Sequence, residues 1–534
     1  MTTLSFHFHG YQPGDLVRWL EPDPLKSPRF EERSSPVAVR IGEDRISGQN
    51  WTDAVLRTYG RIETVLQRAA GVASVDVEPQ TLVWLLERDP DAYHRLFSAW
   101  RRGSAGLVMT PPFHPILPHH HRIDRDAIFE VMIDFYSPLL NRHDGPIGLW
   151  LPEAAYSLET LESYLNSARR ATLHLEGLPD LTRSVHLLLD ARQLAAPEIS
   201  MTAWARTGLN GGVRFAVRDP GLSGDFAFGA PTPPPRPMAA DVLDFSSWSD
   251  YDEHLLHGRT SDTRWTGVRR SDGAVVSRVH NGAPLSQIWK LAFTRMTEQV
   301  EDAVRHAARK ILKRVGVERG PAALRRLAVA YARHLFQAHY RANGFASSEV
   351  AFEAAATSIL RGKVDVDVAG FLARGYTAML MGLRSDPRFW DNLDTRVTFQ
   401  NVACLAQALV DMSGACVRAG EPDLGARLLR LARTALLEFP ETYARLGPSE
   451  LRGAEGWETT EAAWFRALQS EVPERSAIDA VRRAALYAAG EAIASGRHGG
   501  TSALAQDPVA DTGHIAGEAG GEWENRGWCE HRSG

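Results

Sequence analysis

The chain has 534 residues, of which 44% are hydrophobic and 23% are charged, a composition typical of soluble globular proteins. This composition excludes collagen-like, coiled-coil and globally disordered chains, and the length predicts about two to four domains. The chain has 60 Lys and Arg and 65 Asp and Glu, which gives a net charge of −5. Because the protein has no overall positive charge to attract phosphates, we expect no nucleic acid partner.

The cysteines and the apolar segments indicate a cytoplasmic protein. Cys404, Cys416 and Cys529 can form neither a disulfide framework nor a paired metal-ligand spacing, as is usual in a reducing compartment. The segment Met1–His9 lacks the basic start and the long apolar run of a signal peptide. No stretch reaches the roughly 18 continuous apolar residues that span a bilayer, so we expect no membrane partner.

The first half of the chain alternates strand patterns with helix patterns. Strands or short apolar runs are expected, in chain order, at Thr3–His9, Thr81–Leu86, Gly106–Met109, Ile147–Leu151, Thr172–Leu175, Val185–Leu189, Val213–Arg218 and Asp241–Phe245. Helices are expected at about Trp51–Ala69, Asp126–Tyr136 and Leu158–Ala171. Strands separated by helices predict βα units in a parallel sheet or barrel, with the proline-rich segment Gly229–Pro237 as a long surface connection.

From about Ser286 the composition changes to Ala, Leu and Arg, and the strand patterns end. Apolar residues at helical spacing mark one face of each of three helices: Leu324, Leu327, Tyr331 and Leu335; Leu372, Tyr376, Met379 and Leu383; and Val402, Leu405, Leu409 and Met412. These faces predict an α-helical bundle domain. From Ser495 the chain is rich in Gly and acidic residues with little periodicity, which predicts a disordered tail. We therefore divide the chain into an α/β domain at 1–285, a helical bundle at 286–494 and a tail at 495–534.

Two histidine clusters follow expected strands. His7 and His9 point to one face of the first strand, which runs into a polar loop; they are either half-buried, hydrogen-bonded histidines or part of a site at the strand end. His114 and the run His119–His121 lie in a proline-rich segment that is either a surface loop or a zinc site. No Asp, Glu or Cys at telling spacing closes a zinc site, so we predict no metal and no cofactor.

Two carboxylates also follow expected strands. Glu153 comes directly after Pro152, with Trp150 and Tyr156 three residues away on each side. Aromatic faces stack on pyranose rings while a carboxylate attacks or protonates, although Glu153 is equally consistent with a first-turn helix residue. Asp244 closes a later strand and is either part of a solvated acidic turn or the second carboxylate of an acid/base pair.

These clusters, in this order, resemble glycoside hydrolase family 57. The first motif is His7-x-His9-x-x-Gln12-Pro13, the second is Phe113-His-Pro-Ile-Leu-Pro, and the third is Trp150-x-Pro-Glu153. The resemblance covers about residues 1–260 and continues more weakly into the bundle, through Met379-Leu-Met and Phe399-Gln-Asn. It implies an incomplete parallel β/α barrel of the seven-stranded type, followed by the helical domain.

The resemblance implies a retaining glycoside hydrolase or transglycosidase that acts on an α-glucan, an oligo- or polysaccharide. It implies that Glu153 is the nucleophile and that Asp244 is the general acid/base. The implied substrate-binding residues are His7, His9, Gln12, His114, Trp150, Tyr156, Trp248 and Trp289. Of these, Trp289 is the candidate contact from the helical domain, which packs against the barrel after a short link, although a core anchor is the simpler interpretation. We expect the strand of His7 to lie beside the strand that ends in Glu153.

Two departures from the family pattern mark a divergent member. Ser246 stands where the family usually has a glutamate, and Arg384-Ser-Asp-Pro replaces a usual Cys-Gly segment. Two alternatives therefore stay open: a catalytically inactive carbohydrate-binding homologue, and a metal-dependent carbohydrate hydrolase, such as a deacetylase, that uses the histidines. The sequence does not distinguish hydrolysis from transfer to an acceptor sugar. It also identifies neither the glucan nor the oligomeric state.

Overall fold

We describe the protein from a computed structural model of the whole chain. The residues that it describes are 5–11, 73–141, 143, 147–175, 177–182, 185–190, 204–207, 211–218, 242–244, 277–280, 283–286, 289–317, 319–345, 347–389 and 396–433. The expected helix at Trp51–Ala69, the proline-rich connection and the tail at 495–534 lie outside this part of the chain. Among the described helices, none has both the length and the apolar character that crossing a membrane requires.

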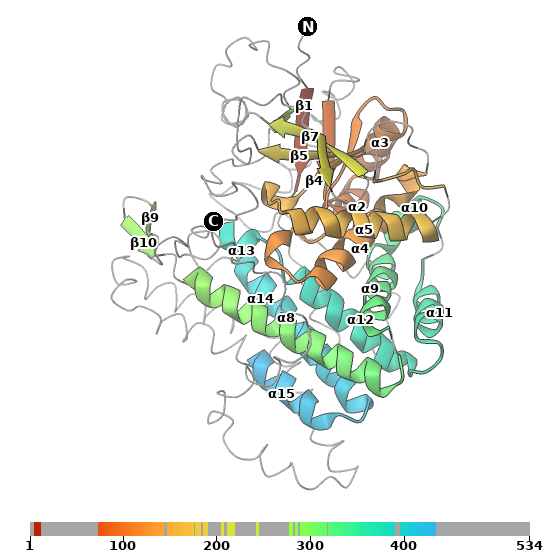
Figure 1. Cartoon of the computed structure of the whole chain (residues 1–534), viewed down its shortest axis with the longest axis vertical. Coiled ribbons are helices and arrows are strands. Elements are labelled where there is room, and N and C mark those ends of the chain that lie inside the picture. The colour runs from red at the N-terminus through yellow and green to blue at the C-terminus, as the bar shows by residue number, and fades with distance from the viewer. Residues whose placement is uncertain are drawn as a thin grey trace.

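A curled parallel sheet forms the N-terminal part of the molecule (Figure 1). Its strands are β1 (Ser5–Gly10), β2 (Ala73–Val77), β3 (Gly106–Met109), β4 (Ile147–Trp150), β5 (Val185–Asp190), β7 (Gly211–Arg218) and β8 (Val242–Asp244). They follow the order β5-β4-β3-β2-β1-β8-β7, every neighbouring pair is parallel, and β5 also pairs with β7, so the described strands form a ring. The expected parallel β/α architecture is confirmed.

Two further pairings complete the described strands. The strand β6 (Trp204–Thr207) runs antiparallel to β7, and β9 (Ser277–His280) forms an antiparallel hairpin with β10 (Ala283–Ser286). The expected strands at Val185–Leu189, Val213–Arg218 and Asp241–Phe245 are confirmed as β5, β7 and β8.

Helices between the first strands cover the sheet. They are α2 (Pro79–Arg88), α3 (Pro90–Arg101), α4 (Arg122–Leu140) and α5 (Leu158–His174), with short 3₁₀ turns η3 (Leu117–His119) and η4 (Pro152–Ala154). Local chemistry sets where they begin: α2 and α3 carry proline in their first turn, the Asp89 side chain accepts from Ala92 N at 3.0 Å, and Ser157 Oγ accepts from Thr160 N at 3.1 Å.

Two expected strand-like runs are wrong. Thr81–Leu86 lies inside α2, and Thr172–Leu175 is the end of α5 and the residue after it. The strand is instead Ala73–Val77, a five-residue segment just upstream. The apolar run around Trp84 is almost fully buried, so its residues are apolar on every side and show no period that distinguishes helix from strand.

The second half of the described chain is largely helical, as expected. Its helices are α8 (Trp289–Arg314), α9 (Gly320–Leu335), α10 (Gln337–Ala342), α11 (Glu349–Leu360), α12 (Val366–Met381), α13 (Asp386–Phe389), α14 (Arg396–Arg418) and α15 (Pro422–Arg433). The three predicted apolar faces fall in α9, α12 with the residues just after it, and α14, and those of their side chains that the structure describes are buried. Figure 1 shows α8, α12, α14 and α15 below the sheet.

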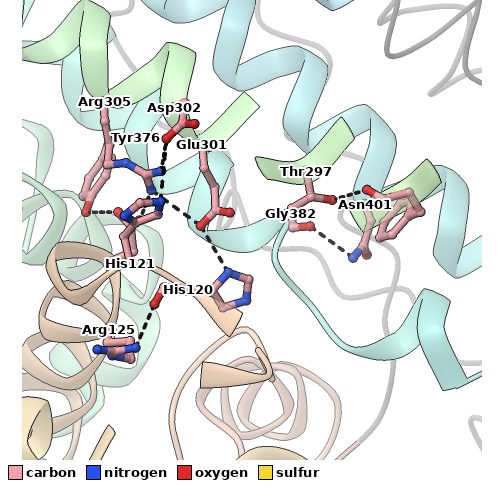
Figure 2. A network of polar contacts seen from close by, with 12 residues as sticks. His120, His121, Arg125, Thr297, Glu301, Asp302, Arg305, Tyr376, Gly382 and Asn401 are labelled. Atoms are coloured by element: carbon pink, nitrogen blue, oxygen red, sulfur yellow. Dashed lines mark hydrogen bonds and ion pairs between the residues drawn. The ribbon is translucent and has the colours of Figure 1, made fainter. Parts of the chain in front are cut away.

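The helical region packs against the barrel through one continuous apolar core. Phe135 of α4 stacks on His339 of α10 with ring centroids 3.8 Å apart. Figure 2 shows a buried polar contact between the same two regions: His120 Nδ1, just before α4, lies 3.1 Å from Glu301 Oε1 of α8. The expectation that these helices pack on the barrel is confirmed, whereas the boundary near residue 285 stays a prediction. Trp289 begins α8, and its side chain is outside the described residues.

Candidate active site

The residues singled out in the sequence gather where the parallel strands have their carboxyl ends. In the register of β1 with β2, His7 stands opposite Ser74 and His9 opposite Asp76. In the register of β1 with β8, His7 also stands opposite Asp244. His114 follows β3 and Glu153 follows β4, so both come from the same edge of the sheet. Ligands of β/α barrels bind at this edge.

A fully buried carboxylate, Asp76, holds both histidines of β1. Its Oδ1 lies 2.8 Å from His7 Nε2, and its Oδ2 lies 2.8 Å from His9 Nδ1. Burial alone would raise the pKa of Asp76, but the charge of His9 and the contacts with both imidazoles hold it at about 2. Asp76 is therefore ionised at neutral pH and fixes the orientation of His7 and His9.

His114 links these histidines to the rest of the site. Its Nε2 lies 3.3 Å from His9 Nε2, its Nδ1 lies 2.9 Å from Ser385 Oγ, and the Tyr11 ring stacks on it at 3.8 Å. Burial, together with the charge of His9, lowers the pKa of His114 well below its ordinary value, so this imidazole is neutral.

Glu153 sits on a strained turn directly after β4. Its φ is 61° and that of Ala154 is 50°, and across the sheet edge Phe113 and His114 have φ of 70° and 45°. A left-handed backbone at a residue other than glycine costs on the order of 1–3 kcal/mol, and such strain clusters at functional sites. The buried Glu153 carboxylate accepts a hydrogen bond from Ser385 Oγ at 2.7 Å and lies 3.6 Å from His114 Nδ1.

A continuous chain of polar contacts runs from Asp76 to Glu153. A serine hydroxyl has a single hydrogen, which Ser385 gives to the acceptor Glu153, so His114 Nδ1–H must donate to Ser385 Oγ. On the other side of the ring, His114 Nε2 lies 3.3 Å from His9 Nε2, and His9 Nδ1 lies 2.8 Å from Oδ2 of the ionised Asp76. The chain of contacts Asp76–His9–His114–Ser385–Glu153 therefore links two carboxylates through two imidazoles and one hydroxyl.

Two of the predicted aromatic residues are described in full. Trp150 is only 2% exposed, and its ring lies 5.8 Å from that of His7 and 5.3 Å from that of His9, so it supports the histidines from inside the barrel. Tyr156 is half-buried at the edge of the apolar core, and burial raises the pKa of its hydroxyl. Their roles toward a sugar stay predictions.

The remaining predicted site residues are described in part or lie outside the described residues. Asp244 ends β8 opposite His7, but its side chain is not described. Gln12 and Trp248 lie outside the described part of the chain. The expectation that β1 lies beside β4 is wrong, because β2 and β3 stand between them. The two strands reach the same site because the sheet curls and His114 spans the gap.

Sequence reasoning missed three residues of this site. Asp76 lies in a strand that was not predicted, although the alternation Ala-Ser-Val-Asp-Val was a weak signal for it. Ser385 and Arg384 belong to a segment that was noted only as a departure from a family pattern. Metal ligation was a further alternative: among the described residues, no three His, Cys, Asp or Glu side chains are grouped so that they could hold a metal ion.

Comparison with known proteins gives matches over most of the chain. The family described as maltose-forming alpha-amylase-like, N-terminal domain matches residues 1–230, and the corresponding C-terminal domain family matches residues 264–513. The crystal structure of an exo-type maltose-forming amylase from Pyrococcus sp. ST04 is similar at 26% identity and a TM-score of 0.66, covering 90% of this chain and 92% of that one.

A second solved structure is much less similar. The 4-alpha-glucanotransferase from Thermococcus litoralis has 13% identity and a TM-score of 0.34, covering 78% of this chain and 60% of that one, too little to inform fold or function. A search of curated proteins gives no match.

Proposed function

Because the chain belongs to glycoside hydrolase family 57, with both domains of its maltose-forming amylase-like branch, we propose that it cleaves α-glucans with retention of anomeric configuration. In this proposal Glu153 is the nucleophile and Asp244 is the general acid/base. We take the ring of parallel strands as the incomplete seven-stranded barrel that the family resemblance implies. The proposed partner is the α-glucan alone, and no cofactor takes part.

The observation that carries this proposal is the environment of Glu153. A buried carboxylate that accepts a hydrogen bond from Ser385 at 2.7 Å is held in one orientation at the carboxyl edge of a parallel barrel. Because Glu153 and Ala154 have left-handed φ angles, the Glu153 side chain does not follow the alternating directions of the side chains of β4. A strained, buried and fixed carboxylate is what a nucleophile requires, since it must meet one carbon atom of the substrate.

The backbone positions of Glu153 and Asp244 support a pair that acts on one bond. Retaining enzymes need two carboxyl groups about 5–5.5 Å apart. Glu153 follows β4 and Asp244 ends β8, and both lie at the same edge of the sheet. The strand β1, which carries His7 and His9, lies between β4 and β8 in the sheet order, so in this proposal the sugar ring binds next to β1.

The reaction follows from these roles. Glu153 attacks the anomeric carbon and forms a glycosyl ester while Asp244 protonates the leaving oxygen. Asp244 then removes a proton from water, or from an acceptor sugar, which attacks the ester and releases Glu153. The contact between His9 and the neutral imidazole of His114 keeps the polar edge of the site preorganised, so that no large reorientation accompanies the change of charge on Glu153.

The product is proposed from a similar solved structure. The relative from Pyrococcus sp. ST04 is described as exo-type and maltose-forming. We therefore propose release of maltose from chain ends as the first activity to assay, with transfer to an acceptor glucan as the second.

The proposal is tested by incubating the purified protein with soluble starch and maltooligosaccharides. Chromatography identifies the products, and proton NMR follows the anomer that forms first. We expect maltose or transfer products whose new anomeric centre has the α configuration. A matched pair of variants, Glu153→Gln and the exposed Glu159→Gln of α5, separates the nucleophile from a general loss of acidic charge. Binding of glucan by the wild type without any turnover would instead support the inactive carbohydrate-binding homologue.

A further inference from the structure

We propose that Ser385, supplied by the helical region, is a positioning residue that holds the Glu153 carboxylate ionised and aimed at the substrate. This inference rests on the proposed function, which gives Glu153 its role. Ser385 is 1% exposed, and its hydroxyl lies 2.7 Å from Glu153 Oε1 and 2.9 Å from His114 Nδ1. The barrel alone therefore does not complete the surroundings of its own candidate nucleophile.

The direction of the two hydrogen bonds makes Ser385 a donor toward Glu153. The carboxylate can only accept, and the neutral His114 can donate from Nδ1, so the serine hydroxyl accepts from one side and donates to the other. A donor that points at a carboxylate favours its ionised form and restricts its rotation. Loss of the hydroxyl would remove this hydrogen bond, while His114 Nδ1 lies 3.6 Å from Glu153 Oε1.

The segment that carries Ser385 is fastened to the barrel on one side. Ser385 N donates to His114 O at 2.9 Å, and Arg384 forms an isolated antiparallel bridge with Pro115. The Arg384 guanidinium donates to Tyr11 OH at 3.0 Å, and the Tyr11 ring stacks on His114. The position of Ser385 is thus set by backbone contacts with the same loop that presents His114.

The helical region fastens the segment from the other side. Asn401 of α14 donates from Nδ2 to Arg384 O at 3.0 Å and to Gly382 O at 3.2 Å. A side chain at Gly382 would meet Leu405 of α14 at 2.6 Å, so glycine permits this close approach. Ser385 is therefore held with little freedom, as a residue that orients a nucleophile must be.

The charges around the contact explain why a hydroxyl suits this position. His9, Arg384 and Asp76 all act on His114, which stays neutral, and Ser385 adds a donor without adding a charge. Glu153 can then lose its negative charge in the ester intermediate and recover it without leaving an unpaired cation beside it. Ser385 is also the last link before Glu153 in the chain of contacts that begins at Asp76, so it couples the docking of the helical region to the state of the nucleophile.

The test compares Ser385→Ala, Ser385→Thr and the control Ser347→Ala in the full chain. Ser347 is a buried serine of the helical region whose Oγ donates to Arg333 O at 2.7 Å, so its replacement removes one hydrogen bond away from Glu153. For Ser385→Ala we expect kcat on a maltooligosaccharide to fall about tenfold to a hundredfold with KM within about threefold of the wild type. The acidic limb of the kcat/KM profile should move up by about one pH unit, because that limb reports the ionisation of the nucleophile.

The variants Ser385→Thr and Ser347→Ala distinguish an effect of the Ser385 hydroxyl on the nucleophile from an effect on the stability of the protein. Ser385→Thr keeps the donor and should recover most of the activity and the wild-type acidic limb, while Ser347→Ala should lower only the melting temperature. An unchanged acidic limb and an unchanged kcat in Ser385→Ala would overturn the inference, as would losses no larger than those of Ser347→Ala.

A crystal structure of Ser385→Ala gives a readout that needs no turnover. We expect the Glu153 carboxylate to rotate away from its wild-type position, toward His114 Nδ1. If the wild type does not act on any α-glucan, the proposed function fails, and this structure still tests the positioning: an unmoved carboxylate would overturn it.

Discussion

Ser385 Oγ donates a hydrogen bond to Glu153 Oε1 at 2.7 Å, although the two residues lie 232 positions apart in the sequence. The contact joins the carboxyl edge of the barrel to the loop between α12 and α13. The site is therefore shared by the two regions, and a change that loosens their interface should affect activity as well as stability.

The first prediction concerns Asp244. Asp244→Asn should reduce turnover of a natural α-glucan about 10²–10⁴-fold, because the leaving sugar oxygen then departs without protonation. An aryl glycoside with a good leaving group needs little protonation and should lose much less activity. Parallel kcat/KM measurements on both substrates check this, and equal losses on the two would argue against Asp244 as the general acid.

The second prediction concerns the pH dependence of stability that arises from Asp76. Its pKa is lowered from 3.8 to about 2 in the folded protein, so the unfolded chain binds the proton first as the pH falls. The stabilisation by Asp76, on the order of 2 kcal/mol, is present above about pH 4 and is lost as the pH falls through about 2. Urea unfolding at several pH values should show a steeper acid loss in the wild type than in Asp76→Asn. Parallel curves for the two proteins would contradict this assignment.

The third prediction concerns the buried contact between barrel and helices. Asp124 of α4 is fully buried, pairs with Arg305 of α8 and accepts from Tyr376 OH of α12 at 2.7 Å. Asp124→Ala leaves the buried guanidinium of Arg305 without this carboxylate and should cost about 3–5 kcal/mol of unfolding free energy.

Two further variants provide reference values for the loss of unfolding free energy in Asp124→Ala, all measured by chemical denaturation. Tyr376→Phe, which removes one hydrogen bond to a charged group, should cost about 1.5–3 kcal/mol. The pair between Arg314 and Glu421 serves as the exposed control, and Arg314→Ala should cost about 1 kcal/mol or less. A cost for Asp124→Ala no greater than that of the control would show that the contacts of Asp124 with Arg305 and Tyr376 do not hold the two regions together.

The fourth prediction concerns metal. The imidazoles of His7 and His9 already contact Asp76 through one nitrogen each, while their other nitrogens face Ser74 and His114. A zinc ion would have to displace these contacts, so we expect no stoichiometric zinc in the purified protein and no loss of activity with a chelator. Elemental analysis and a chelator titration measure both. Inactivation that added zinc reverses would favour the metal-dependent hydrolase.

Much of the fold could be predicted from the sequence where a pattern runs long enough to show its period. The helix expected at about Leu158–Ala171, which the structure has as Leu158–His174, and the faces of α9, α12 and α14 have that length, and they were found. The five-residue strand Ala73–Val77 is too short, and the buried run around Trp84 has no polar side to reveal its helical period. Such short or fully buried segments carry no periodic signal.

The candidate site was predictable only where residues stand together in a motif. His7, His9 and Glu153 lie in such motifs, and the structure brings them to one edge of the sheet. Asp76 and Ser385 are single residues whose importance arises from tertiary contacts with distant residues. No spacing in the sequence links them to Glu153, because the curl of the sheet and the docking of α12 and α14 create the neighbourhood.

Trapping the covalent intermediate tests the central claim most directly. The wild type is incubated with a fluorinated α-glucosyl fluoride, which forms the glycosyl ester quickly and hydrolyses it slowly, and the digested protein is analysed by mass spectrometry. We expect one added sugar on the peptide that contains Glu153, and none on Glu153→Gln. A sugar on another carboxylate, or turnover of α-glucan with inverted configuration and no trapped ester, would contradict the account.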